Sequence, residues 1–102
     1  LGQRGQIQLK FGRYSDAIET FSKSLDKDSR SLSAWYGKGM AHLGISQPDD
    51  SLMCFDAALG IDQDYVWAWA GKVRAFKAKG DEKSAANARA VAKEIDSNFP
   101  IE

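Results

Sequence analysis

Apolar residues recur at intervals of three and four positions along several segments of this chain. One such segment contains Ile18, Phe21 and Leu25, and the same spacing returns over residues 52–59. On a helix this spacing gathers the apolar side chains into one stripe that can be buried, and no segment alternates with the two-residue period of a strand. The pattern predicts an all-α fold.

The pattern itself repeats every 34 residues without gaps. Residues that coincide at this offset include Leu1, Trp35 and Trp69; Gly5 and Gly39; Phe21 and Phe55; and Asp28, Asp62 and Asp96. A period of this length is typical of arrays of helical hairpins, in which each hairpin buries its apolar face only by stacking on its neighbours.

Turn and cap residues divide each repeat into two helices. Gly12 and Gly80 suit the left-handed residue that follows a helix, Pro48 suits a first helical position, and Asp81 suits an N-cap. The expected helices cover residues 1–11, 15–27, 32–45, 48–60, 66–79 and 82–97.

These positions resemble the tetratricopeptide repeat family, whose pattern has a bulky residue, a small residue four positions later, and Ala, aromatic and Ala in the second helix. The second repeat fills these places with Trp35, Gly39, Ser51, Phe55 and Ala58, and the first repeat with Leu1, Gly5, Ala17, Phe21 and Ser24. The third repeat departs from the pattern at Val73 and Arg89. The proline usual after the second helix is replaced by Ser29, Gln63 and Ser97, so polar side chains are expected to hold that turn.

The resemblance implies one domain over residues 1–102, a right-handed solenoid of six antiparallel helices. Its repeats would cover residues 1–31, 32–65 and 66–102. The first helix begins part-way through its repeat, so we expect further repeats upstream. The last helix is polar and Ala-rich, as expected of a capping helix, and Pro100 would close it.

Composition narrows the classes of function. Fourteen basic residues balance fourteen acidic ones, so no overall field favours nucleic acid as a partner. The single cysteine excludes an internal disulfide, and no apolar run has the length of a membrane span. We therefore expect neither a nucleic-acid nor a membrane partner and no cofactor, with the cytoplasm as the default location.

By the same resemblance, the first helices of the repeats line a concave groove that binds a protein or peptide ligand. The positions that match the groove-facing positions of the family, and are predicted to contact a partner, are Gln6, Leu9, Lys10, Tyr36, Met40, Leu43, Trp67, Arg74 and Lys77. The small residues at these positions, among them Gly37, Gly44, Ala70 and Gly71, would form its floor. Aromatic, thioether and guanidinium groups suit a peptide, which predicts a protein-interaction module, a scaffold or adaptor, without catalysis.

Alternatives remain at the groove. Tyr36 and Trp67 can instead pack against adjacent helices, and the lysines can be merely solvated. A subclass of the family grips the C-terminal carboxylate of chaperone peptides with Lys, Asn and Arg. The matching positions here are Gly2, Gln6, Gly37, Trp67 and Gly71, which leave almost no donors, so this ligand is not expected.

Other chemistry is sparse. His42 lies at an inward position without a second metal ligand and is interpreted as a core residue, and Cys54 as a small packed side chain. No pair of titratable groups forms a plausible catalytic site, so an enzyme is not expected. Two further functions stay open: self-association through the uncapped first helix, giving a homo-oligomer, and a regulatory arm of a larger enzyme.

Overall fold

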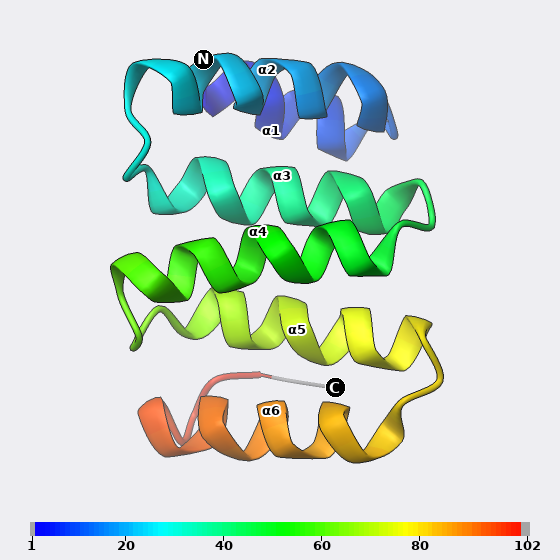
Figure 1. Ribbon diagram of the computed structural model, residues 1–102, viewed down its shortest axis with the longest axis vertical. Helices are drawn as coiled ribbons and strands as arrows, with labels where there is room; N and C mark the ends of the chain where they lie inside the picture. The colour runs from blue at the N-terminus through cyan, green and yellow to red at the C-terminus, as the bar shows by residue number, and fades with distance from the viewer. Residues whose placement is uncertain (1, 101–102) are drawn as a thin grey trace.

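The computed structural model describes the backbone of residues 2–100 and the side chains of residues 4–100. The described part contains six helices and no strand: α1 (Gly2–Lys10), α2 (Tyr14–Lys27), α3 (Leu32–Gly44), α4 (Pro48–Ile61), α5 (Val66–Ala78) and α6 (Glu82–Ile95). They stack in chain order (Figure 1). The all-α prediction is confirmed, and the predicted helix ends agree to within two residues; Leu1 lies outside the described residues.

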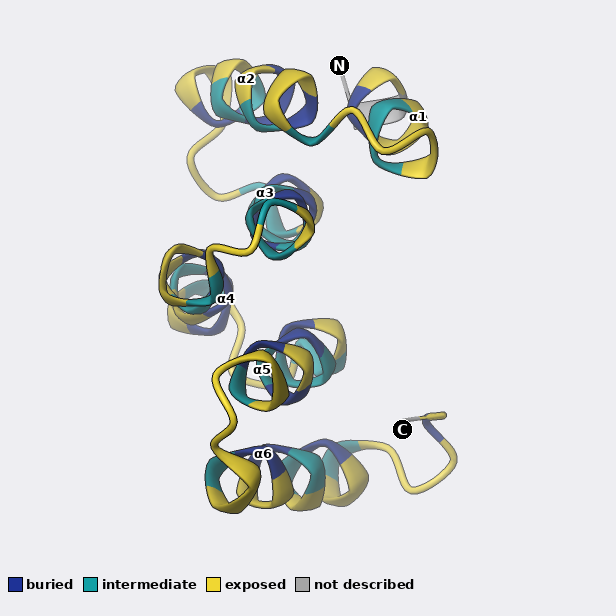
Figure 2. Ribbon diagram, turned by 90° about the vertical axis from the view of Figure 1, so that its right-hand side faces the viewer, coloured by how far each residue is buried: buried dark blue, intermediate teal, exposed yellow. Residues whose placement is uncertain are grey.

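The helices form two rows. In Figure 2 the first helices of the hairpins, α1, α3 and α5, lie toward one side, and α2 and α4 lie toward the other. Besides each helix and the next in the chain, α1 contacts α3 and α3 contacts α5. These first helices therefore share one continuous face, and the groove described below lies on it.

Two phenylalanine rings join neighbouring repeats. Phe21 of α2 is fully buried between Gly5 of α1 and Gly37 of α3, and a Cβ added at Gly5 would lie 2.5 Å from the ring. Phe55 of α4 occupies the same place one repeat later, with an added Cβ at Gly39 2.6 Å from its ring. Glycine is needed at these positions because a larger residue would overlap the phenylalanine ring.

The third repeat is packed differently. Val73 stands where Gly5 and Gly39 stand in the earlier repeats, and it is almost completely buried. Arg89 stands where α2 and α4 carry a ring. The two departures from the repeat pattern are thus linked, since the valine side chain fills space that a ring would otherwise take.

Polar side chains hold the turns between repeats. The backbone N–H two residues beyond Asp28, Asp62 and Asp96 donates to the aspartate Oδ1 at 3.1, 3.0 and 3.1 Å. The indole Nε1 of Trp35 and that of Trp69 donate to the carbonyls of these turns, 2.9 and 3.1 Å away. The expected use of polar groups in place of proline is confirmed.

The turns inside the repeats follow the predicted chemistry with one addition. Gly12 and Gly80 have φ of 74° and 78°, Pro48 is the first residue of α4, and Asp81 Oδ1 accepts from the backbone N–H of Ser84 at 3.1 Å. Ser46, with φ of 62°, takes the same left-handed conformation 34 residues after Gly12. The repeat period could have identified it.

Candidate functional site

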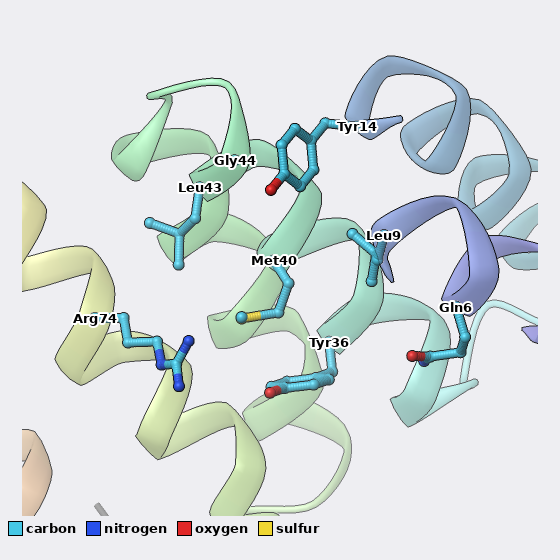
Figure 3. Close-up of a pocket in the computed structure, with 8 residues that line it drawn as sticks. All are labelled: Gln6, Leu9, Tyr14, Tyr36, Met40, Leu43, Gly44 and Arg74. Atoms are coloured by element: carbon cyan, nitrogen blue, oxygen red, sulfur yellow. The ribbon is translucent and has the colours of Figure 1, made fainter. Parts of the chain in front are cut away.

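An open cavity of about 470 Å³ lies on the shared face of α1, α3 and α5. It is lined by Gln6 and Leu9 of α1, Tyr14 of α2, Tyr36, Met40, Leu43 and Gly44 of α3, and Arg74 of α5 (Figure 3). Each of the three repeats contributes side chains, so the cavity depends on the stacking of the hairpins rather than on any one of them.

Helical spacing explains why these side chains converge. Tyr36, Met40 and Leu43 are separated by four and three residues, which places them on one stripe of α3. Gln6 and Leu9 are related in the same way on α1. The cavity therefore has an apolar wall from α3 that is flanked by α1 and, on the far side, by α5.

Arg74 supplies the charge of this cavity. In Figure 3 its guanidinium points toward the space around Met40 and Tyr36. The ion pairs of the described residues are Lys23–Glu19, Lys72–Asp56 and Lys79–Asp49, and Arg74 takes part in none of them. Burial raises the pKa of Tyr36, and the nearby Arg74 partly opposes this. The cavity thus offers a protonated phenol and a cation beside apolar surface.

A smaller cavity of about 110 Å³ continues the groove toward its third-repeat end. Tyr36 and Arg74 line both cavities, and the second also includes Trp67, Ala70, Val73, Lys77, Phe99 and Pro100. The Trp67 ring centroid lies 6.0 Å from that of Tyr36 and 4.8 Å from that of Phe99, both edge to face. This end of the groove is partly covered by the chain's own C-terminal segment.

The structure brings together most of the predicted groove residues. Gln6, Leu9, Tyr36, Met40, Leu43 and Arg74 line the larger cavity, and Trp67 and Lys77 line the smaller one. Lys10 lines neither of these two and is exposed at the end of α1. Tyr36 and Trp67 also pack against other aromatic rings, so the two alternatives considered for them are not exclusive.

The predicted floor of small residues is right only in part, since Gly44 and Ala70 line the two cavities. Gly37 and Gly71 do not form the groove floor, because each is buried against the ring of Phe21 or Phe55. Sequence reasoning also missed Phe99, which lies on Trp67 because the chain turns back after α6. Its place in the repeat, 34 residues after Tyr65, was an available signal.

His42 and Cys54 differ in how well they match expectation. His42 is only partly buried, and its Nδ1 lies 2.8 Å from Gln47 Oε1, so its assignment to the core is wrong. Cys54 is buried as expected, and burial raises the pKa of its thiol to about 11. Among the described residues, no cluster of three His, Cys, Asp or Glu could hold a metal ion. No helix of the described residues has the length and apolarity to cross a membrane.

Comparison with known proteins is consistent with this architecture. The family profile described as "Tetratricopeptide repeat" matches residues 32–65. The first TPR domain of human RPAP3 superimposes with a TM-score of 0.92 at 18% identity, covering 96% of this chain and 77% of that one. Residues 32–65 thus match a tetratricopeptide repeat (TPR), and the chain as a whole has the fold of a TPR domain. The chaperone SycD of Yersinia enterocolitica is similar to this TPR domain too, with a TM-score of 0.91 at 19% identity over 97% of the chain and 75% of SycD.

The sequence relative is a much longer protein. The TPR domain is 29% identical over 87 residues to a Hordeum vulgare protein named probable UDP-N-acetylglucosamine–peptide N-acetylglucosaminyltransferase SPINDLY. The match covers 85% of this chain and 9% of that protein. The chain therefore spans about a tenth of the relative's length.

Proposed function

We propose that this TPR domain is a protein-interaction module that holds an extended segment of another protein in the groove of α1, α3 and α5. The observation that carries the proposal is the convergence of Tyr36, Met40, Leu43 and Arg74 on one open cavity. Tyrosine and methionine give large, adaptable contact area, and arginine can bind a carboxylate through two parallel hydrogen bonds.

Similar domains support a peptide as the ligand. The second TPR domain of Spaghetti is known bound to an HSP90 peptide, with a TM-score of 0.85 at 22% identity over 92% of this chain and 87% of that one. The second TPR domain of human RPAP3 is known in complex with an HSP70 peptide. In this chain Gly37 and Gly71 are buried and Trp67 packs on Phe99, so these positions supply no carboxylate clamp. The ligand is therefore held by apolar contact and by Arg74.

The groove predicts the ligand's chemistry and the strength of binding. One bulky apolar side chain suits the wall formed by Met40 and Leu43, and an acidic residue beside it suits Arg74. The contact area of three repeats is small against the entropy lost on association, so the dissociation constant should be on the order of micromolar.

Peptide selection with matched variants tests the proposal. Peptides selected from a random display library on the folded domain are measured against Met40→Ala and Arg74→Glu. The controls are Met53→Ala and Arg30→Glu, which make the same changes at exposed positions away from the groove. We expect each groove variant to weaken binding by about tenfold, corresponding to about 1.4 kcal/mol, and the controls to bind as the wild type does. Equal affinity of all four variants would refute the groove as the binding site.

A second candidate function rests on the outer surface of α1. Ile7 of α1 and Phe11, which directly follows α1, are 56% and 71% exposed, which favours stacking of a second copy on this end. Light scattering over a range of concentrations tests it, with Phe11→Lys compared with Met53→Lys, a change at an equally exposed position. A monomer of about 11.2 kDa at every concentration would exclude self-association.

A further inference from the structure

The C-terminal segment places an aromatic side chain on the groove. Phe99 is only 7% exposed, although it follows the last helix, and its ring meets that of Trp67 edge to face at 4.8 Å. Figure 2 shows the chain leaving α6 and returning toward α5 on the side of α1. Trp67 itself remains 50% exposed, so Phe99 covers only part of it.

The turn after α6 explains how Phe99 reaches this position. The backbone N–H of Phe99 donates to the carbonyl of Asp96 at 3.0 Å, just as the N–H of Tyr65 donates to Asp62 at 3.1 Å one repeat earlier. Tyr65 then meets the ring of Tyr36 edge to face at 6.4 Å, as Phe99 meets that of Trp67. The repeat thus delivers an aromatic ring to the preceding first helix twice.

The two rings are held differently. Tyr65 lies between two helices, since α4 ends and α5 begins within a few residues of it. Phe99 is held within the described residues by the Asp96 turn, by the Trp67 ring and by Lys93, whose Nζ donates to the carbonyl of Phe99 at 2.6 Å. Lys93 is exposed on α6, and its bond to a neutral carbonyl can be exchanged for water. The Phe99 ring is the more buried of the two, and water or a ligand side chain can replace each of these contacts.

We propose that the Trp67 end of the groove is an aromatic-binding subsite and that Phe99 is its built-in competitor. The partner it fits is an extended segment that carries an aromatic side chain, which replaces Phe99 on Trp67 while neighbouring residues enter the larger cavity. Tyr36 and Arg74 line both cavities, so one ligand can contact the two without a gap. This inference rests on the proposed function, because it assigns one end of the same groove.

Competition within one chain lowers the apparent affinity for a partner. A tethered side chain acts at an effective concentration of the order of millimolar, and the affinity falls by the fraction of molecules in which the subsite is open. Removing the Phe99 ring should therefore strengthen binding of an aromatic peptide by at least about fivefold.

The probe is a fluorescein-labelled peptide with the sequence of residues 94–100, which carries the side chain already seen on Trp67. Fluorescence anisotropy compares its binding to the wild type, to Phe99→Ala and to Phe11→Ala, the same change at a ring that is 71% exposed just after α1. A second peptide has alanine in place of the phenylalanine. Circular dichroism confirms that each variant is folded.

A spectroscopic measurement reports on the contact itself. Trp67 is the tryptophan whose ring lies against Phe99, so its indole N–H resonance, assigned with Trp67→Phe, should respond to the loss of the Phe99 ring. We expect Phe99→Ala to shift this ¹H–¹⁵N resonance, the peptide to bind this variant at least about fivefold more tightly than the wild type, and bound peptide to move the resonance back.

Either of two results would overturn the inference. An unchanged Trp67 resonance in Phe99→Ala would show that the ring is not on Trp67 in solution. A shifted resonance without tighter peptide binding would show that the site accepts Phe99 only as part of the turn. Neither result touches the proposed function, which is tested at Met40 and Arg74 with peptides selected independently.

Discussion

Replacing Gly71 with alanine should destabilise this domain even though alanine is the better helix former. Gly71 lies within α5 against the ring of Phe55, and an added Cβ would lie 2.6 Å from one ring carbon and overlap the ring tip. The ring cannot move away freely, because it is fully buried and also fills the space beside Gly39. The gain in helix propensity is at most about 1 kcal/mol, and overpacking a core costs about 1–3 kcal/mol.

Gly60→Ala is the matched control for this prediction. Gly60 is exposed on α4, and nothing lies within 4 Å of a Cβ added there, so only the gain in propensity remains. Guanidinium unfolding at 25 °C should show Gly71→Ala to be less stable than Gly60→Ala by about 1–3 kcal/mol, with similar m-values. Phe55→Leu should reduce this penalty when it is combined with Gly71→Ala. Equal stability of the two alanine variants would refute the ring-and-glycine packing.

Three other measurements follow from local features. Ser46→Gly should stabilise the domain by about 0.5–1 kcal/mol in thermal unfolding, because the left-handed conformation costs glycine less than serine; no change would argue against that conformation. The hydrogen bond with Ser84 holds the pKa of Asp81 below its usual range, so its stabilising effect is present above the unfolded pKa and is lost as the pH falls through the folded one. The unfolding midpoint of Asp81→Ala should therefore lie below that of the wild type at pH 7, and the gap should narrow below about pH 4; a constant gap would contradict this. Because burial raises the pKa of Cys54 to about 11, its reaction with Ellman's reagent at pH 8 should be more than about a hundredfold slower than that of a free thiol and become fast on unfolding.

The fold could be predicted from the sequence because the apolar spacing, the repeat period and the turn residues all indicate the same helical hairpins. Spacing, period and turn residues all depend on local geometry, which a helix repeats at fixed intervals. The stripe of Tyr36, Met40 and Leu43 could be predicted for the same reason, since three residues on one face of one helix share a direction.

The remaining features depend on which distant part of the chain packs against a given residue. A glycine at position 37 can form part of a groove floor or make room for a buried ring. The path of α2 decides between them, because it places Phe21 against Gly37. The course of the chain after α6 likewise decides that Phe99 meets Trp67, because nothing in its local sequence specifies that partner. Lys10 has the helical register of a groove residue but lies at the very end of α1, beyond the reach of the cavity.

The rings that join neighbouring repeats also determine how the domain comes apart. Because Phe21 and Phe55 each belong to two repeats at once, opening either boundary exposes a whole ring, and helices α1 to α5 should unfold together as one cooperative unit. In α6 the buried residues are Ala85, Ala88 and Ala92, which contribute far less apolar area than a ring. Amide hydrogen exchange should therefore be fastest in α6, where partial unfolding would release the end of the groove while the rest stays folded.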